Sequence, residues 1–468
     1  MTNRAIRNLS TAFVLLFAVL AARQIYVQVV AAPKIAARQA NPRHALLDRG
    51  RGRILATDGT VLAQTIGGKR VYPLGAELAQ PVGYVSVRYG TSGIEHAFDS
   101  ALTSPDLSGD PMAQLRALGA TLRGTTVPAQ GADVVTTIVP AIEAQLYASL
   151  SRYPRAAGVV LDPRSGAVLA LASVPSYDPN AFDAEFPSLS SDPSAPLLDR
   201  ALDGLYPPGS TFKIFTAAAA LESATVTMQS RFDDPGYLAI GNFTLHDNES
   251  EATGNADLTT AFALSSNVDF AQIALKMGVD TFYEYLDRWA IGDSLDFQLP
   301  AARAGVPPKS DIVPGELAQM AFGQGALLTT PLQMALIGAT IANGGDEPRP
   351  YLVRQIVSAG VPASSSGPGT LASPVSADTA AKVTQMMVAV VQRGTGTPAR
   401  LPHVTVAGKT GTATNPLGRS HSWFVCFAPA QSPRVAVAIV VENVGYGATY
   451  AAPIARDVLR AALESAGS

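Results

Sequence analysis

Three short motifs restrict the possible folds of this chain most strongly, because each occurs once and they follow a fixed order. They are Ser210-Thr211-Phe212-Lys213, Ser265-Ser266-Asn267 and Lys409-Thr410-Gly411-Thr412, the last two about 55 and about 200 residues after Ser210. A serine followed by a lysine at the third position is weak evidence alone, but no other serine of this lysine-poor chain has one. A fold that joins the three motifs would build one reactive site.

The first motif predicts an activated serine. Residues 207–209 are Pro-Pro-Gly and turn the chain sharply, and the apolar run Ile214 to Leu221 predicts a buried helix. Ser210 is then expected at the helix N-terminus, where the dipole stabilises an oxyanion. Lys213 lies one turn further on the same side. Burial and the dipole favour its neutral form, so it can accept the serine proton.

The second motif is expected between two helices. Beside Ser210 and Lys213, the hydroxyl of Ser265 can relay a proton to a leaving amine, and the amide of Asn267 can donate to a substrate carbonyl. Taken alone, each of the first two motifs is more often structural, a helix cap or a polar turn. The functional interpretation depends on their occurring together.

The third motif is expected on a strand that residues 404–408 begin. Its small side chains, above all Gly411, let an extended substrate pair with the strand edge. The backbone N–H groups of Thr412 and Ser210 would form a two-donor oxyanion hole. Lys409 adds positive potential, and the hydroxyls of Thr410 and Thr412 can receive a terminal carboxylate. An ordinary hairpin edge is the alternative.

Composition excludes several other classes of function. The net charge of −3 gives no reason to expect nucleic-acid binding. The five histidines stand in neither a G-x-S-x-G context nor metal-ligand spacing, so we expect no histidine-based triad, no metal and no cofactor. Cys426, the single cysteine, cannot form an intramolecular disulfide, and its apolar surroundings predict a buried, inert thiol.

The N-terminus predicts export. Arg4 and Arg7 precede an apolar run from Leu9 to Ala22, which at ~1.5 Å per residue is too short for a ~30 Å bilayer core unless residues 25–32 extend it. We expect a cytoplasmic tail at 1–8 and a transmembrane anchor at 9–32. The alternative is a cleaved signal peptide.

Two regions follow, a β-rich one at 33–154 and a larger one at 155–468. The first should contain a hairpin from residue 51 to 63, a helix after Gly93, a strand at 133–138 and a helix near Pro140. The second begins with a hairpin at 158–172, ends with strands at 423–428 and 435–442 and a helix at 453–463, and has a surface loop at Ser364–Pro374. Strands at both ends with helices between predict an α/β (α+β) fold with one antiparallel sheet.

These motifs and their flanks make the chain resemble the class B penicillin-binding proteins, the monofunctional peptidoglycan D,D-transpeptidases, above all the penicillin-binding protein A-like members of actinobacteria. The matching segments are Leu205–Lys213, Phe322-Gly323-Gln324-Gly325, Thr330–Ala335, Ala407–Ala413, Ser422–Val425, Arg51–Ile54 and Gly93–Glu95. The chain departs from the family pattern at Gly59-Thr60, where an arginine is frequent, and at Cys426, where glycine is common.

The resemblance implies a penicillin-binding/serine β-lactamase-like domain with a five-stranded antiparallel sheet, an elongated pedestal and a single membrane-spanning helix, with the catalytic domain outside the cytoplasm. Ser210 would release D-alanine from a D-Ala-D-Ala stem peptide, and an amine of a neighbouring stem would resolve the acyl-enzyme. β-Lactams would acylate the same serine, and a polytopic glycan polymerase would be a partner. The implied catalytic residues are Ser210, Lys213, Ser265, Asn267 and Lys409, and the implied substrate or oxyanion residues are Thr410, Gly411, Thr412 and Gln324.

Three rival functions share parts of this pattern. A β-lactamase would need a carboxylate base, and neither Glu284 nor Glu316 has the required E-x-x-L-N context. A D,D-carboxypeptidase or endopeptidase would differ only in its acceptor. A β-lactam sensor or a scaffold would keep its role without the Ser210 nucleophile.

Overall fold

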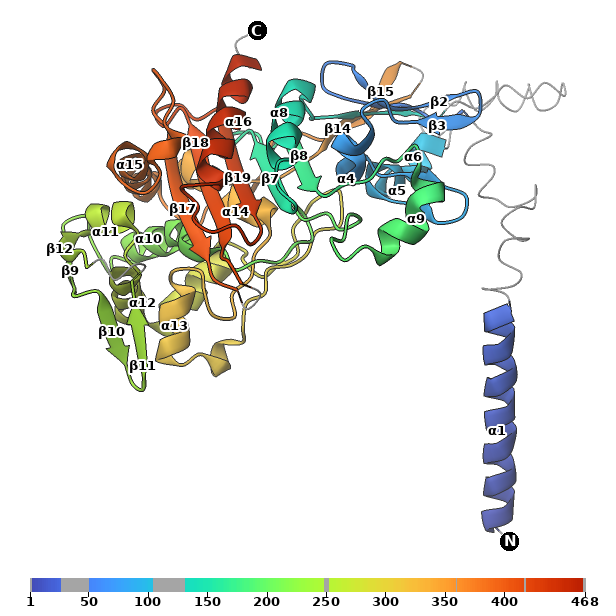
Figure 1. Ribbon diagram of the computed structural model, residues 1–468, viewed down its shortest axis with the longest axis horizontal. Coiled ribbons are helices and arrows are strands. Elements are labelled where there is room, and N and C mark those ends of the chain that lie inside the picture. Colours follow the sequence, from blue (N-terminus) through green and yellow to red (C-terminus); the bar gives the residue numbers. More distant parts are fainter. Residues whose placement is uncertain are drawn as a thin grey trace.

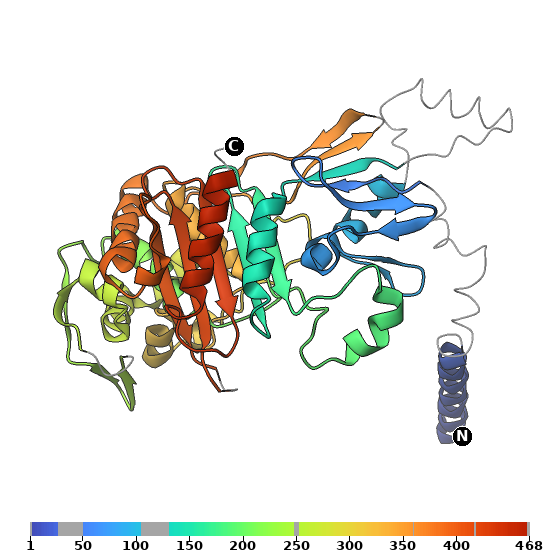
Figure 2. The ribbon, with the colours of Figure 1, turned by 45° about the horizontal axis from the view of Figure 1, so that its top comes forward.

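The computed structural model describes residues 2–26, 50–103, 131–247, 252–358, 360–415 and 418–465. From residue 50 onward the chain forms an elongated body (Figure 1). A five-stranded sheet with its helices occupies one part of that body, and a second, smaller β-rich part adjoins it (Figure 2).

The five-stranded sheet is antiparallel throughout and joins strands from both ends of the larger region. Its order is β17 (Ala407–Ala413), β18 (His421–Ala428), β19 (Val435–Val441), β7 (Ala156–Leu161) and β8 (Val168–Val174). All residues of β18, β19 and β7 are buried, which explains their continuous apolar sequences. The predicted hairpin and the two late strands are confirmed, and β17 lies at one edge.

Helices cover both faces of this sheet. On one face pack α8 (Pro140–Leu150) and α16 (Ala451–Ser465), and on the other packs α14 (Pro331–Ala342). Successive side chains of β18 point to opposite faces of the sheet. Phe424 therefore belongs to the hydrophobic cluster on one face and Trp423 to the cluster on the other. The predicted helices near Pro140 and at 453–463 are confirmed. Cys426 is fully buried, and burial raises the pKa of its thiol, as an inert residue requires.

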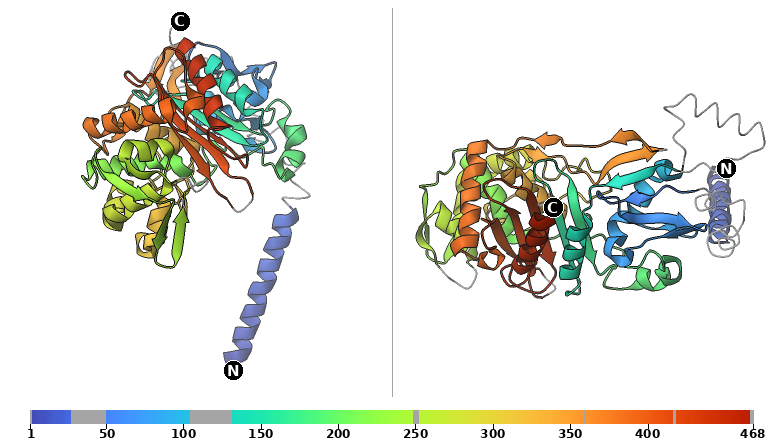
Figure 3. Two further views of the ribbon diagram at one scale, coloured as in Figure 1. Left: turned by 60° about the vertical axis from the view of Figure 1, so that its left-hand side comes forward. Right: turned by 90° about the horizontal axis from the view of Figure 1, so that it is seen from above.

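A mainly helical part lies beside β17 (Figure 3). Its helices and short 3₁₀ segments are η3 (Gly209–Phe212), α10 (Lys213–Glu222), α11 (Leu258–Leu264), α12 (Asn267–Arg288), η5 (Lys309–Asp311), α13 (Pro314–Met320), α15 (Ala377–Arg393) and η6 (Thr397–Ala399). Two small antiparallel pairs extend it, β9 (Arg231–Asp234) with β12 (Gly254–Asp257), and β10 (Tyr237–Ile240) with β11 (Phe243–His246). Because α15 packs on both α11 and β17, this part is held against the sheet edge.

The β-rich part is a six-stranded sheet assembled from distant segments, which we call the pedestal. Its order is β15 (Val361–Ser365), β14 (Val353–Ser358), β6 (Asp133–Thr136), β1 (Ile54–Leu55), β2 (Val61–Ile66) and β3 (Lys69–Val71). The hairpin of β1 and β2 and the strand β6 agree with the sequence. Two strands, β14 and β15, come from the region that the sequence assigns to the second domain.

The predicted loop at Ser364–Pro374 is wrong in part. Its first residues end β15, and Thr370–Ala372 form β16, which pairs with β13 (Glu347–Pro348). Every residue of β15 is exposed, so no apolar alternation marks the strand in the sequence. Pairing with β14, and through it with β6, creates the strand.

Short elements complete the pedestal and its border with the larger part. They are η2 (Gly75–Leu78), α4 (Ala79–Val82), β4 (Val85–Ser86), β5 (Gly90–Thr91), α5 (Gly93–Ala97), α6 (Asp99–Thr103) and α9 (Phe182–Ser191). The helix predicted after Gly93 is therefore α5. Its Glu95 is buried and accepts from Arg51 at 2.6 Å and Arg70 at 2.7 Å. This buried network joins two of the motifs noted in the sequence.

The first helix, α1, spans Thr2–Ile25. Among the described residues, no helix is both long enough and apolar enough to cross a membrane. The predicted anchor at 9–32 continues beyond α1 into residues 27–32, which lie outside the described ranges.

Candidate active site

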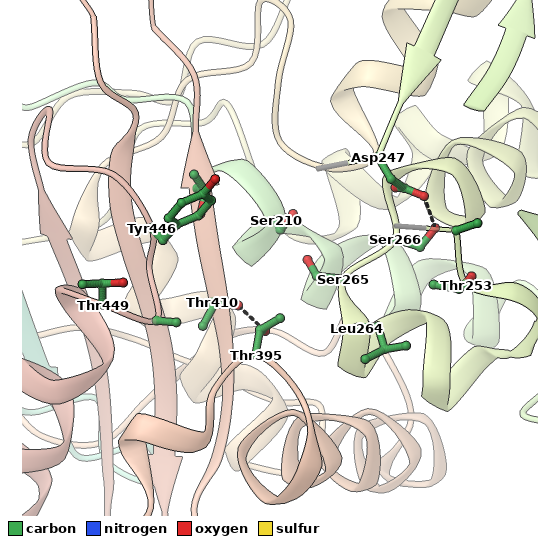
Figure 4. A pocket seen from close by; sticks show the side chains of 13 residues that line it. Ser210, Asp247, Thr253, Leu264, Ser265, Ser266, Thr395, Thr410, Tyr446 and Thr449 are labelled. Atoms are coloured by element: carbon green, nitrogen blue, oxygen red, sulfur yellow. Dashed lines mark hydrogen bonds between the residues drawn. The ribbon is translucent and has the colours of Figure 1, made fainter. Parts of the chain in front are cut away.

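The three motifs meet at a cleft between the edge strand β17 and the helical part. The cavity has a volume of about 340 Å³. Its lining residues are Ser210, Asp247, Ala252, Thr253, Leu264, Ser265, Ser266, Thr395, Thr410, Thr412, Tyr446, Ala448 and Thr449. Figure 4 shows Ser210 and Ser265 near the middle of this cleft, with Thr410 on the strand side.

Ser210 lies in η3, directly before α10, as the sequence predicts. Gly209 has a φ of +55°, and its amide donates to Gly323 at 2.8 Å. A β-carbon at Gly209 would lie 3.0 Å from the Thr412 carbonyl oxygen, so glycine permits the close approach of this turn to β17. The indole of Trp423 donates to the Pro207 carbonyl at 3.1 Å. These contacts hold the serine turn against the sheet.

The side chain of Lys213 binds the second motif. Its Nζ donates to the Ser265 carbonyl at 2.6 Å and to Asn267 Oδ1 at 2.9 Å, and lies 3.3 Å from Ser265 Oγ. Lys213 is fully buried, and burial lowers its pKa to about 7. The ammonium and the neutral amine are therefore both populated near neutral pH, as a proton acceptor needs.

Ser265 lies between two lysines. The Nζ of Lys409 donates to Ser265 Oγ at 2.8 Å and to the Thr410 carbonyl at 3.1 Å. Burial, together with the neighbouring charge of Lys213, lowers the pKa of Lys409 well below its ordinary value. Ser265 itself ends α11 with a left-handed φ of +67°, an unusual conformation for a residue with a side chain. The hydroxyl is thus held where it can pass protons between two amines.

Asn267 is the first residue of α12 and directly follows Ser265 and Ser266, which line the cavity. Because its Oδ1 accepts from Lys213, its amide nitrogen is left to donate elsewhere. A free amide donor of this kind is what binding a substrate carbonyl requires.

The third motif forms most of β17. Thr410 and Thr412 line the cavity, and Thr412 Oγ1 accepts from the Gly447 amide at 3.4 Å. Gly411 lies between them, and a β-carbon there would come within 2.9 Å of the Pro208 carbonyl oxygen. The strand therefore lies unusually close to the serine turn.

Gln324 lies apart from this group. Its Oε1 accepts from Thr414, one residue after β17, at 2.8 Å, and it is not among the residues that line the cavity. The adjacent Gly323 contacts the serine turn through its carbonyl group.

Sequence reasoning missed several lining residues. Thr395 follows α15, and its hydroxyl lies 2.5 Å from that of Thr410. Its position between Gly394 and Gly396 was an available signal for a special turn. Tyr446, Thr449 and Asp247 reach the cleft through tertiary packing, and no motif marks them.

Comparison with known proteins gives consistent results over most of the chain. The penicillin binding protein transpeptidase domain matches residues 156–460, and the penicillin binding protein A dimerisation domain matches residues 51–127. The peptidoglycan D,D-transpeptidase PbpA of Mycolicibacterium smegmatis is 34% identical over 98% of this chain and 99% of its own. The peptidoglycan D,D-transpeptidase MrdA of Escherichia coli is 29% identical, with 81% of this chain and 69% of its own covered.

Solved structures of similar fold lead to the same family. Penicillin-binding protein A of Mycobacterium tuberculosis, as a ceftriaxone acyl-enzyme complex, has a TM-score of 0.82 at 33% identity over 90% of this chain and 100% of its own. A D,D-transpeptidase domain from Eggerthella lenta has a TM-score of 0.81 at 36% identity, over 90% of this chain and 99% of its own.

Proposed function

The chain belongs to the class B penicillin-binding proteins, and from this membership we propose how its own residues carry out the reaction. It is a peptidoglycan D,D-transpeptidase that works through a serine acyl-enzyme. One observation carries the assignment of roles: Ser210 and Ser265 line one cleft beside an edge strand. The buried amines of Lys213 and Lys409 both contact Ser265 from behind this lining.

In the first step, Ser210 Oγ attacks the carbonyl carbon of the penultimate D-alanine of a stem peptide. Lys213, in its neutral form, accepts the hydroxyl proton. The backbone N–H groups of Ser210 and Thr412 stabilise the oxyanion that forms. The C–N bond to the terminal D-alanine then breaks, and Ser265 passes a proton to the leaving amine from the lysines that it contacts.

In the second step, the amine of a neighbouring stem attacks the ester carbonyl. The same groups act in reverse. The acceptor amine gives a proton to the Lys213 side of the site, and the Ser210 oxygen receives a proton as it leaves. Release of the new amide leaves a cross-link and the free serine.

Binding of the donor depends on the strand. An extended stem peptide would pair with the edge of β17, and the terminal carboxylate would lie at Thr410 and Thr412. Burial makes two charged lysines around Ser265 unfavourable, so the entering carboxylate would favour protonation of Lys409. Gln324 would contribute to this end of the site, where it contacts Thr414.

We also propose that residues 9–32 anchor the chain in the cell membrane as a single pass, with residues 33–468 on the outer side. Arg4 and Arg7 before the apolar run favour a cytoplasmic N-terminus, and the substrate lies outside the cell. The pedestal would contact a polytopic glycan polymerase, because cross-linking acts on glycan strands that such a polymerase makes.

Intact mass spectrometry of the full-length protein with benzylpenicillin tests the assignment of Ser210. One covalent adduct per chain is expected, lasting minutes to hours, and none in the Ser210→Ala variant. An adduct in that variant would show that another residue is the nucleophile. An adduct lost within seconds would indicate a β-lactamase instead.

A further inference from the structure

Three aspartates lie together on the side of the second motif away from β17. Asp234 ends β9, Asp247 follows β11, and Asp269 belongs to the first turn of α12. Asp234 and Asp269 are fully buried and Asp247 nearly so. Three chain segments therefore bring carboxyl groups to the start of one helix, where the dipole favours negative charge.

Asp247 makes the most direct contact with the catalytic residues. Its Oδ1 accepts from the backbone amide of Asn267 and, at 3.2 Å, from that of Val268. These are among the first amides of α12, which have no acceptor within the helix. The hydroxyl of Ser266, the N-cap residue, accepts instead from the backbone amide of Asp269 at 2.9 Å. A residue 20 positions upstream thus completes the capping of this helix.

This cap continues to the reactive lysine. Asn267, whose backbone Asp247 holds, accepts from Lys213 with its side chain at 2.9 Å. Asn267 stands at the helix end, so a change in the capping contact would move its side chain relative to Lys213. Asp247 therefore acts on the lysine through one intervening residue.

The hydroxyl groups in this cluster cannot satisfy all of the carboxylates. Ser266 Oγ is 3.0 Å from Asp234 and 3.4 Å from Asp247, and Thr253 Oγ1 is 2.9 Å from both Asp234 and Asp269. Each hydroxyl has one proton for two such contacts. Backbone amides also donate to Asp234, and the negative charge of the cluster favours a positive charge nearby.

Lys213 is the cation that faces this cluster. From β17, Lys409 also reaches Ser265 and adds a competing positive charge. The rings of Phe270 and Phe322 lie 5.4 and 5.8 Å from Lys213 Nζ. The other charged groups facing the lysine, among the described residues, are the three aspartates.

We propose that Asp247 is a positioning residue of the acylation step, which holds Asn267 against Lys213 and supplies negative charge to the buried surroundings of that lysine. The proposal rests on the proposed role of Lys213 as proton acceptor. Burial, together with the neighbouring Asp234 carboxyl, raises the pKa of Asp247 to about 6, so its carboxylate is mainly ionised at neutral pH. A negative charge near an amine favours the ammonium form, against the burial that favours the neutral one.

Two substitutions separate the two roles. In Asp247→Asn the amide oxygen can still accept from the two backbone amides, but the charge is lost. In Asp247→Ala both the hydrogen-bond acceptor and the charge are lost. Asp280→Asn is a matched control, since Asp280 lies beyond the kink of α12 at Gly278, is exposed, and pairs only with Lys309 among the described residues.

The measurement is the acylation rate constant of the full-length protein with a fluorescent penicillin between about pH 5 and pH 9, a range that spans the acidic limb expected for Lys213. Loss of the Asp247 charge lowers the pKa of Lys213, so the neutral amine persists to lower pH. The acidic limb of Asp247→Asn should shift down by ~0.5–1 pH unit, the size expected for one partly screened charge. Asp247→Ala should show the same shift and a rate at its plateau at least ~10-fold lower, and Asp280→Asn should match the wild type.

If the acidic limb of the acylation rate did not shift in Asp247→Asn while the wild-type protein acylated normally, the proposed effect of the Asp247 charge on Lys213 would be overturned, and the positioning role would not be affected. Equal plateau rates in the Asn and Ala variants would overturn the positioning role. If the wild-type protein formed no adduct at Ser210, the proposed function itself would fail, and this inference with it.

Discussion

Replacement of Gly411 by alanine tests how closely β17 must approach the serine turn. A β-carbon there would lie 2.9 Å from the Pro208 carbonyl oxygen and 3.0 Å from both the Thr211 methyl group and the Trp423 β-carbon. These separations are roughly 0.5 Å shorter than ordinary carbon contacts. Two of the three neighbours are backbone or β-carbon atoms, which a rotamer change cannot move away.

The strand must therefore shift relative to Ser210. Overpacking of this kind costs ~1–3 kcal/mol of stability. The larger effect should be on the reaction, because a displacement of about 1 Å at a reacting group can cost ~100-fold in rate. For the smaller displacement required here, we expect acylation by benzylpenicillin to slow by about 10-fold.

The assay is the rate of adduct formation by mass spectrometry, with thermal unfolding measured in parallel. Gly367→Ala is the matched control, because a β-carbon at Gly367 meets nothing within 4 Å. If Gly411→Ala reacted at the rate of this control, the tight contact between β17 and the serine turn would not determine the geometry of the site.

Four further outcomes are expected. Acylation should rise with pH through about 7, as the buried Lys213 loses its proton, and a rate that does not change between about pH 5 and pH 9 would contradict this role. Ser265→Ala should slow acylation by ~100-fold or more in stopped-flow measurements, since the relay between the two lysines is removed, and an unchanged rate would exclude that relay. Glu95→Ala should destabilise the pedestal by ~3–5 kcal/mol in denaturant unfolding, because two buried arginines lose the carboxylate that they share, whereas an unchanged midpoint would show that their other partners and water compensate them. Thr395→Val should weaken binding of carboxylate-bearing substrates, seen as a raised KM with kcat largely kept, because the hydroxyl that orients Thr410 is lost; a loss in kcat alone would point to a different role.

Elements with strong local patterns could be predicted from the sequence. The hairpin of β7 and β8 and the strands β18 and β19 are long apolar runs, and they are buried as such runs require. The prediction that Ser210 and Lys213 lie on the same side of a helical turn depends only on helix periodicity. The position of β17 at the sheet edge followed from its small residues.

Elements that depend on distant partners could not be predicted. β15 is exposed along its whole length, so its sequence resembles a loop, and only hydrogen bonds to β14 make it a strand. Nothing in the sequence relates Asp247 to the second motif.

The sequence by itself determined which chemical groups are available and where each motif lies on its own helix, turn or strand, because these depend on neighbours a few positions away. The tertiary structure decided that Ser265 lies between Lys213 and Lys409, and that Asp247 completes the start of α12. Hydrogen bonds between residues far apart in the chain form only where packing of the sheet and helices brings them within about 3 Å. The burial that comes with this packing also lowers the pKa of both lysines.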